Sequence, residues 1–179
     1  MNLSIIIPTL NESDIIQSCL SGLQSYRERG HEVIVVDGGS TDATIALSSP
    51  LIDQLVTSPC GRASQMNAGA AVARGDVLLF LHADTSLPGD AEAILKGIPF
   101  HDHTWGRFDV RLAGTSWLFR VIESGMNLRS RWTGIATGDQ AVFMSRQCFI
   151  NAGGFPGIAL MEDIAFSRIL KRLARPVCL

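Results

Sequence analysis

Polar residues that could bind a metal or a ligand come directly after hydrophobic segments of this chain. Asp37 follows the segment 32–36, and His82 and Asp84 follow the apolar run 77–81. Side chains two residues apart in a strand point to the same side, so His82 and Asp84 would face one site if the strand stayed extended. A carboxylate at a strand end suits a hard divalent cation, which takes oxygen ligands and completes its shell with water and substrate phosphates. Asp84 is therefore the leading candidate for a Mn²⁺ or Mg²⁺ ligand.

Each of these two residues also has a purely structural interpretation. Magnesium disfavours nitrogen ligands and manganese tolerates them, so His82 is the weaker candidate, and a hydrogen-bonded structural histidine is the alternative. Asp84 could instead be a turn residue before a helix that starts near Gly89.

The elements that must position these residues alternate between strands and helices. Four hydrophobic segments predict buried strands, and the Ala-rich segment 62–74 predicts a helix between the last two of them: Leu3–Ile7 ended by Pro8, Glu32–Val36, Asp53–Thr57 and Val77–Leu81. This alternation predicts an α/β fold with a mostly parallel central sheet and helices on both faces. Ligands of such sheets bind beyond the carboxyl ends of the strands, which places Asp37 and Asp84 on one rim with Asn11 and Glu12.

The second half of the chain is less regular. The segment 105–112 alternates polar and apolar residues and predicts a half-exposed strand, and the segment 116–130 has apolar residues at helical spacing. A last helix is expected to begin near Glu162. With 179 residues, the chain is expected to form a single domain, 1–179.

Composition excludes several classes of protein. The formal charge of -2 lacks the basic excess typical of nucleic-acid binding, so nucleic acid is not expected as a partner. The four cysteines are far apart without a C-x-x-C pair, which indicates reduced thiols rather than a zinc site or a disulfide framework. No apolar run reaches 18 residues and no signal-peptide pattern opens the chain, so a cytoplasmic protein is expected.

Four motifs, in order and spacing, carry a resemblance to a known family: "SIIIPTLNES", "VVDGGSTD", "RASQMNAGAAVARGDVLLFLHADT" and "MEDIAFSRILKR". Together they resemble the family 2 glycosyltransferases, which have the A-type nucleotide-diphospho-sugar transferase fold. The resemblance is closest to small, non-processive bacterial members that carry His-Ala-Asp-Thr where most relatives carry an Asp-x-Asp pair. Here the first position of that pair is His82 and only the second, Asp84, is an aspartate. The number and identity of the metal ligands therefore stay open.

The resemblance implies a nucleotide-sugar donor site built from the first half of the chain. It implies contacts with the base and ribose by Pro8, Leu10 and Glu12, hydrogen bonds from the base to Asp37, and approach to the nucleotide by Arg62 and Asn67. Arg62 near a helix N-terminus would add positive potential for a diphosphate. Without the resemblance, Asp37 could be a simple turn residue and Glu12 an acid at the start of a helix.

The resemblance also implies sugar transfer to a hydroxyl acceptor, with inversion, and a carboxylate as general base. It assigns the base to Asp163, with Glu162 as an orienting or acceptor-binding group. Helical spacing permits either residue to face a site, and an acidic first helical turn is the structural alternative. Asp139 is a weak candidate for the acceptor side, because a turn explains Gly138 and Asp139 equally well.

The expected function is thus a metal-dependent glycosyltransferase with a donor-binding half, 1–100, and an acceptor and catalytic half, 101–179. A non-catalytic or truncated nucleotide-sugar-binding domain is the main alternative, because the chain stops at "RPVCL", where relatives continue. A sugar nucleotidyltransferase is less favoured, since "PTLNES" lacks the Gly-rich, basic loop that holds a triphosphate. The absence of a Q-x-x-R-W motif argues against a processive synthase.

The segment 116–132 raises a further hypothesis. Its aromatic and basic residues could contact a membrane surface, which would place the protein at the inner face of the membrane: Trp117, Phe119, Arg120, Arg129, Arg131 and Trp132. The alternative is that the apolar residues of this helix pack on the sheet.

Overall fold

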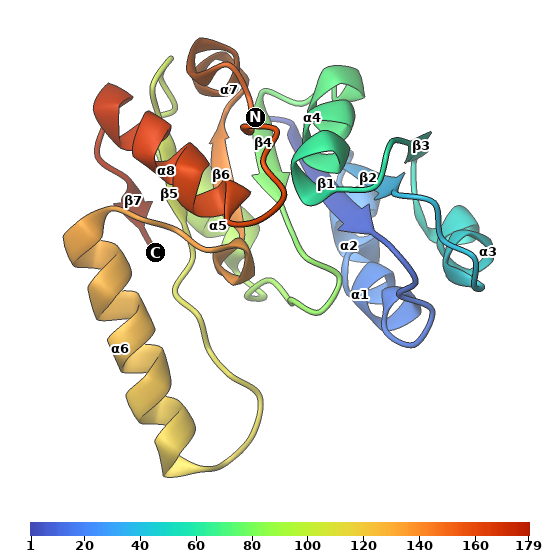
Figure 1. The fold of residues 1–179 in the computed structure, drawn as a ribbon, viewed down its shortest axis with the longest axis horizontal. Helices are drawn as coiled ribbons and strands as arrows, with labels where there is room; N and C mark the ends of the chain where they lie inside the picture. Colours follow the sequence, from blue (N-terminus) through green and yellow to red (C-terminus); the bar gives the residue numbers. More distant parts are fainter.

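The strands of the first half form where hydrophobic segments predict them. The computed structural model describes residues 1–179 (Figure 1). Parallel pairing in the order β3-β2-β1-β4 joins the strands β1 (Leu3–Thr9), β2 (Glu32–Asp37), β3 (Gln54–Thr57) and β4 (Val77–Phe80). Their carboxyl ends therefore meet at one edge of the sheet, as predicted for a ligand site.

Three strands of the second half complete the sheet on the far side of β4. The strand β6 (Val142–Ser145) runs antiparallel to β4 and to β5 (Trp105–Arg107), and β7 (Val177–Cys178) pairs parallel to β5. The full order is β3-β2-β1-β4-β6-β5-β7. The sheet is thus mixed, with parallel pairing everywhere except around β6.

Helices cover both faces of the sheet because residues of each strand alternate between two hydrophobic cores. Ile5 and Ile7 face a core completed by α1 (Ile16–Gly22), α2 (Gln24–Glu28) and α5 (Ala91–Lys96). Ile6 faces a second core, completed by α4 (Arg62–Val72), α7 (Arg146–Ala152) and α8 (Glu162–Leu173). The short helix α3 (Thr44–Ser48) and the 3-10 turn η1 (Ser49–Leu51) lie beside α1. The predicted fold class is confirmed.

Pro8 does not end the first strand. Strand β1 continues to Thr9, with Pro8 opposite Val36 of β2, whereas its pairing with β4 stops at Ile6. Proline removes one N–H from a ladder, and it is tolerated where one side of the strand has no partner. The expectation that the strand stops before Pro8 is therefore wrong by two residues.

The predicted half-exposed strand 105–112 is shorter than expected, and it is buried. All three residues of β5 are buried, including Arg107. Beyond Asp109 the backbone leaves the sheet, because the N–H and carbonyl of Val110 bond the side-chain amide of Asn127 at 2.9 and 3.0 Å. A side chain from a distant helix thus replaces the strand partner.

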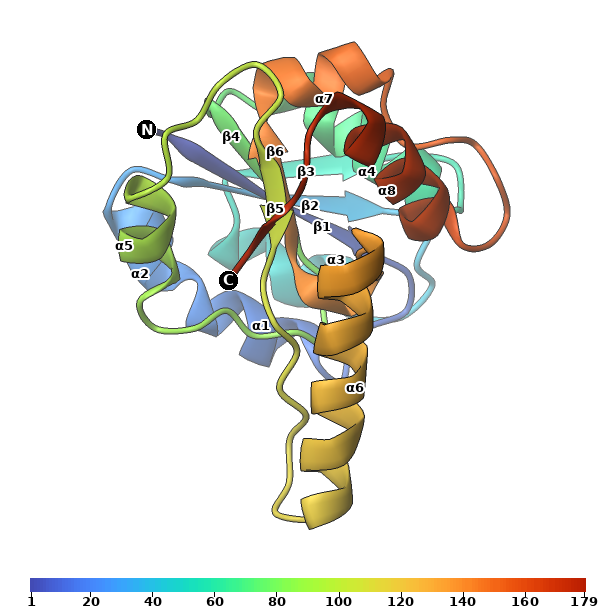
Figure 2. The same cartoon turned by 90° about the vertical axis from the view of Figure 1, so that its left-hand side faces the viewer.

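Helix α6 (Trp117–Thr133) projects from the body of the molecule, accompanied only by the segment 108–116 (Figure 2). Ser116 caps its start by accepting a hydrogen bond from the Leu118 N–H, and Gly134, in a left-handed conformation, ends it. The interpretation that its apolar residues pack on the sheet is wrong, since Trp117, Leu118, Val121 and Ile122 are exposed. None of the helices combines the length and the apolar character that crossing a membrane requires.

Candidate functional site

The loops after β1 and β2 are bound to each other by hydrogen bonds at the carboxyl edge of the sheet. The Asn11 N–H donates to Ser40 Oγ at 2.8 Å, and the Thr41 N–H donates to Asn11 Oδ1 at 2.8 Å. The Glu12 N–H donates to Thr44 Oγ1 at 2.8 Å. These bonds between backbone and side chains fix one wall of the predicted nucleotide crevice.

Asp37 stands at the end of β2 and is almost completely buried, at 1% exposure. Its Oδ2 accepts hydrogen bonds from the N–H groups of Gly39 and Ser40, at 2.8 and 2.9 Å, so it does hold a turn. Its Oδ1 is buried without a hydrogen-bond partner. Buried acceptors are normally paired, so this oxygen is an unsatisfied acceptor at the edge of the sheet.

Gln65 is a residue of this edge that sequence reasoning missed. Its Nε2 donates to the carbonyl of Thr9 at 2.7 Å and to that of Val36 at 2.8 Å. Gly38 packs against the same amide, which lies 3.0 Å from where a Cβ would stand. The signal in the sequence was a polar residue on the buried face of an Ala-rich helix, and its task is to fix α4 to the ends of β1 and β2.

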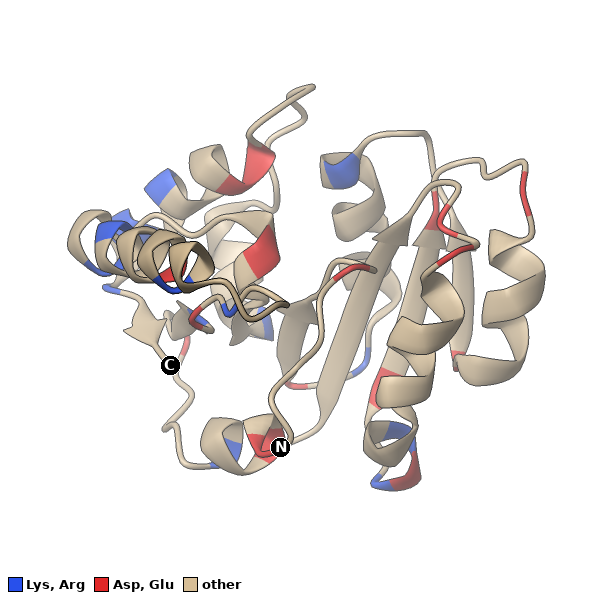
Figure 3. Cartoon of the chain, turned by 90° about the horizontal axis from the view of Figure 1, so that it is seen from below, with Lys and Arg blue, Asp and Glu red and all other residues tan.

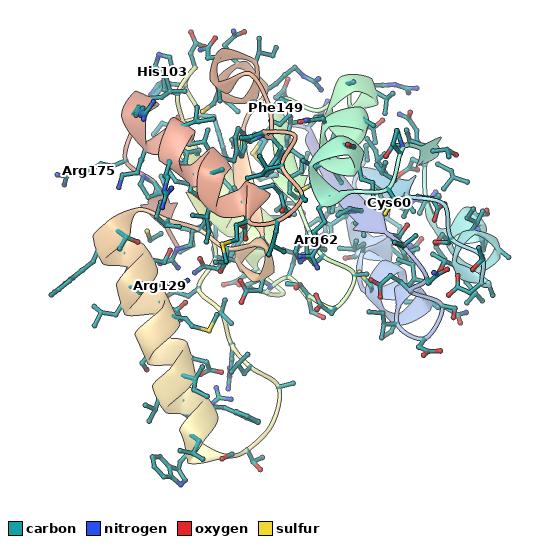
Figure 4. All side chains as sticks on the ribbon, in the orientation of Figure 1. Cys60, Arg62, His103, Arg129, Phe149 and Arg175 are labelled. Carbon is teal, nitrogen blue, oxygen red and sulfur yellow. The ribbon has the colours of Figure 1, made fainter.

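The remaining donor-site candidates differ in exposure. Pro8 is buried within β1, Leu10 is 40% exposed, and Glu12 is half-buried. Arg62 is the exposed first residue of α4 and lies near the middle of the molecule in Figure 4. The edge thus exposes Leu10, Arg62 and part of Glu12, whereas Pro8 is enclosed within the sheet.

The structure gives Asn67 a different task from the nucleotide contact that was expected. Its side-chain Nδ2 donates to the Phe155 carbonyl at 2.9 Å, and its Oδ1 accepts from the Phe155 N–H at 2.8 Å. A Cβ at Gly154 would stand 2.8 Å from the same Oδ1. Asn67 therefore anchors the segment around Phe155 to α4, with both its polar atoms already engaged.

His82 and Asp84 do not share one extended strand. Strand β4 ends at Phe80, and a turn follows in which the Thr85 N–H donates to the His82 carbonyl at 3.0 Å. His82 lines a small cavity with Gly138, Glu162 and Asp163, whereas Asp84 lines a larger one. The prediction that both residues face the same side depended on an extended backbone, and it is wrong for that reason.

The larger cavity has a volume of about 680 Å³ and lies between the segments 84–88 and 108–114. Asp84 and Asp139 both line it, as does Arg120 of α6. Asp139 belongs to the 3-10 turn η2 (Gly138–Gln140), and its Oδ1 accepts a hydrogen bond from Thr137 Oγ1. The metal and acceptor candidates of the sequence therefore face one cavity, although they are 55 residues apart in the chain.

The small cavity places the two candidate bases on the other side of η2. Glu162 and Asp163 form the first turn of α8, where Glu162 is buried and Asp163 half-buried. Asp163 Oδ2 accepts from the Gly138 N–H at 2.8 Å, and its Oδ1 accepts from the N–H of Ile164 at 2.7 Å. Gly138 packs directly against the ring of His82, leaving no space for a Cβ. Turn η2 therefore lines both cavities, with Gly138 at the small one and Asp139 at the larger one.

Charges from several segments act on His82. Burial lowers the pKa of His82 below its ordinary value, and Arg62 acts in the same direction. Asp84, Asp139 and Asp163 oppose this lowering of the pKa, because negative charge near the ring favours its protonated form. His82 is therefore favoured as a neutral side chain at neutral pH.

The side chains at this edge fit a divalent cation only in part. Nowhere does the chain hold three or more His, Cys, Asp or Glu side chains in an arrangement that could bind a metal. Asp84 is an exposed carboxylate on the wall of the larger cavity, and Asp139 faces the same cavity. This arrangement fits a hard cation bound by one or two carboxylates and completed by water and phosphate oxygens. His82 lies in the other cavity and is not part of that set.

The fold is that of the A-type nucleotide-diphospho-sugar transferases, and comparison with known proteins gives the family. The sequence profile described as "Glycosyl transferase family 2" matches residues 4–159. The chain belongs to this family.

Relatives of known sequence are glycosyltransferases by name. A PGL/p-HBAD biosynthesis glycosyltransferase of Mycobacterium tuberculosis is 38% identical over 91 residues, which are 47% of this chain and 36% of that protein. The uncharacterized glycosyltransferase YibD of Escherichia coli is 28% identical over 148 residues, or 76% of this chain and 41% of that protein. The chain thus spans well under half the length of either relative.

Solved structures share the fold. The mannosyltransferase PcManGT from Pyrobaculum calidifontis, in complex with GDP-Man and Mn²⁺, has a TM-score of 0.74 and 24% identity, covering 99% of this chain and 54% of that one. TarS of S. aureus, residues 1–349 in complex with UDP-GlcNAc, has a TM-score of 0.71 and 22% identity, covering 100% of this chain and 56% of that one.

Proposed function

We propose that this chain is the sugar-transferring domain of a non-processive, inverting glycosyltransferase that uses a nucleotide-diphosphate sugar and a divalent cation. Residues 1–100 bind the donor, and residues 101–179 supply the base and the acceptor side. The observation that carries the proposal is that residues of η2 line both cavities, with Asp84 and Asp139 at the larger one and His82 and Asp163 at the smaller one. These residues come from three separate segments of the chain, which the fold brings to the two neighbouring cavities.

The donor nucleotide occupies the crevice between the loops after β1 and β2. The unpaired Oδ1 of Asp37 accepts a hydrogen bond from an N–H of the base, which satisfies a buried oxygen. Leu10 packs on the base, and Glu12 accepts from a ribose hydroxyl. Arg62, at the N-terminus of α4, adds positive charge toward the diphosphate.

Asp84 holds the divalent cation, with the donor phosphates and water as its other ligands. When bound, such a cation stabilises the negative charge that develops on the departing phosphate. Asp84 is exposed on the cavity wall, so its carboxylate can reach a ligand without a change in the backbone. We therefore expect donor binding to depend on the cation and on Asp84.

Asp163 is the general base that takes the proton from the acceptor hydroxyl. Its two oxygens accept one backbone hydrogen bond each, and an ionised carboxylate has about four acceptor positions, so it can still accept from a hydroxyl. Glu162 is buried beside it and orients the acceptor or the base. Asp139 contacts the acceptor in the larger cavity, whose volume can hold a small sugar or polyol.

The test is a thermal-shift panel of nucleoside diphosphates, each with Mn²⁺, Mg²⁺ or a chelator. UDP and GDP come first, because the structural neighbours bind UDP-GlcNAc and GDP-Man. A ligand at 100 times its Kd adds about 2.7 kcal/mol to the free energy of unfolding, which raises Tm by about 5–10 °C in a chain of this size. We expect one diphosphate to stabilise the chain selectively, and only with the cation.

Three variants make this experiment specific. Asp84→Ala should remove the cation-dependent stabilisation, and Asp37→Asn should weaken the stabilisation with either cation. Asp102→Ala, an exposed position away from the carboxyl edge, is the control and should behave as the parent chain. The proposal fails if no diphosphate stabilises the chain. An unchanged cation dependence in Asp84→Ala removes only Asp84 from the metal site.

A further inference from the structure

Helix α6 directs its apolar side chains away from the protein. We call six of them the apolar stripe; they are 49–85% exposed: Trp117, Leu118, Val121, Ile122, Leu128 and Trp132. At about 100° per residue, these positions fall within an arc of about 140° on one side of the helix. An exposed apolar surface of this kind marks an interaction site in soluble proteins.

The opposite, polar side of α6 is fixed to the rest of the chain. Glu123 accepts from the Leu112 N–H, and Arg120 Nη2 donates to the carbonyls of Leu112 and Gly114, at 2.9 and 3.1 Å. Asn127 bonds the backbone of Val110 through both its polar atoms. These bonds set the rotation of the helix about its axis, so the apolar stripe stays outward.

Positive charge surrounds the apolar stripe, although the whole chain is slightly acidic. The segments 109–139 and 164–179 contain eight lysines and arginines against three acidic residues, a formal charge of +5 in a chain of -2. Figure 3 shows this concentration of basic residues on and beside α6. The two segments touch, because Lys171 Nζ donates to the Thr133 carbonyl at the end of α6 at 2.7 Å. The remainder of the chain therefore carries a formal charge of -7.

We propose that the apolar stripe docks on an anionic membrane surface, with α6 lying in the plane of the interface. Apolar side chains would enter the boundary between headgroups and acyl chains, and the surrounding cations would meet anionic headgroups. Trp117 and Trp132 lie about 22 Å apart along the axis, at a rise of 1.5 Å per residue, and tryptophan favours this interface.

The charge distribution decides between a membrane and a second copy of the chain. Two copies paired through the apolar stripe would bring two surfaces of strong positive charge together, which opposes association. An anionic bilayer instead complements both the apolar area and the charge. Arg129, at the edge of the stripe, can extend its charged end to the headgroups while its aliphatic part stays with the apolar residues. Figure 4 shows Arg129 and Arg175 on the same side of the molecule.

The experiment is flotation of the full chain with vesicles of phosphatidylcholine alone or with 30% phosphatidylglycerol, combined with tryptophan fluorescence. Trp105 is fully buried, so a blue shift on binding would report Trp117 and Trp132. We expect flotation and a blue shift with the anionic vesicles only, and weaker binding at high salt.

Paired variants separate the apolar and the electrostatic contributions. The double variant Trp117→Ser/Trp132→Ser should lose at least about tenfold in partitioning, and Arg129→Gln a few-fold. The controls are Leu55→Ser/Ile150→Ser, which remove exposed apolar residues elsewhere, and Arg74→Gln, which removes an exposed cation elsewhere. Both controls should bind as the parent chain does. Circular dichroism and Tm verify that each variant folds.

Three outcomes would overturn the proposal. The first is no flotation with anionic vesicles, and the second is equal flotation of the tryptophan variant, which would indicate charge attraction alone. The third is concentration-dependent dimerisation, measured by sedimentation without lipid and abolished by Trp117→Ser/Trp132→Ser, which would assign the apolar stripe to a second copy. None of these readouts depends on sugar transfer, so the docking proposal and the proposed function can fail independently.

Discussion

Two backbone N–H groups hold the carboxylate of Asp163, one from its own helix and one from η2. Such bonds fix the direction of its remaining lone pairs. An aspartate that only capped a helix would need no bond from Gly138, 25 residues away. Two backbone hydrogen bonds thus fix the position of the Asp163 carboxylate, as a general base requires. This distinguishes Asp163 from the neighbouring Glu162.

Replacing Asp163 tests its role directly. Asp163→Asn removes the proton acceptor and puts an amide where two N–H groups donate, so we expect transfer to fall by about 10² or more, with donor binding retained. The measurement is transfer of labelled sugar, with nucleotide affinity determined in parallel. Glu162→Gln is the matched comparison, and a larger loss in that variant would reverse the assignment of the base.

His82 predicts a pH dependence of stability. Burial lowers the pKa of His82 in the folded chain below its unfolded value of about 6.5. Below about pH 6.5 the unfolded chain takes up a proton that the folded chain resists, so this contribution to the free energy of unfolding is present above that pH and is lost as the pH falls toward the folded pKa.

The measurement is the free energy of unfolding from chemical denaturation between pH 5 and pH 8. His82→Gln should reduce its slope against pH, whereas His103→Gln, at an exposed position, should leave the slope as it is in the parent chain. An equal slope in all three proteins would show that His82 does not titrate in this range.

Helix α4 borders the candidate site, and two of its residues fix its position on the sheet. Gln65 binds the ends of β1 and β2, and Gly69 allows the helix to approach the sheet. A Cβ at Gly69 would lie 2.5 Å from Ile6 Cγ2 and 2.8 Å from Val36 Cγ2, both on β-branched core residues. The close packing of α4 on the sheet thus depends on the absence of a side chain at Gly69.

A pair of glycine substitutions tests this packing. Gly69→Ala should destabilise the chain by about 1–3 kcal/mol, because two core side chains must move. Gly125→Ala, in the middle of α6 with no atom within 4 Å of its Cβ position, should stabilise it by about 0.5–1 kcal/mol. Both values come from thermal or chemical unfolding without lipid. If Gly69→Ala proves as stable as the parent chain, α4 packs less closely than described.

At the scale of the whole molecule, aromatic rings join the first half of the chain to the second half. Phe155 packs against Phe80 of β4 and Phe166 of α8, with ring centroids 4.9 and 4.1 Å away, and Phe149 of α7 completes the group. Asn67 holds the backbone of Phe155 from α4. A core shared in this way should make both halves unfold together.

Truncating Phe155 tests that coupling. Phe155→Ala leaves a cavity between β4 and α8, and we expect a loss of about 3–5 kcal/mol in the free energy of unfolding, with a single transition. Ile150→Ala, at a position 60% exposed, should cost far less. The measurement is chemical denaturation followed by circular dichroism and by fluorescence. Two separate transitions in the parent chain would contradict a shared core.

Local patterns in the sequence were sufficient to predict the elements of the first half of the chain and the last helix. The strands β1 to β4 and the helices α4 and α8 lie where hydrophobic runs and helical spacing predict them, because residues close in the chain decide burial there. The position of Asp37 and Asp84 at one edge of the sheet could be predicted from the parallel order of the strands alone. The roles of the individual side chains remain predictions.

Tertiary contacts decided what the local pattern left ambiguous. Beyond Asp109 the backbone leaves the sheet because Asn127 replaces its strand partner, and Asn67 is engaged by a segment 88 residues away. The apolar stripe of α6 faces outward because the polar side of the helix binds the segment 110–114, a choice that helical periodicity alone does not encode. The sequence by itself thus determined the class of fold and the edge of the site. Only the folded chain decided which way α6 faces and which cavity each carboxylate lines, because both depend on partners distant in sequence.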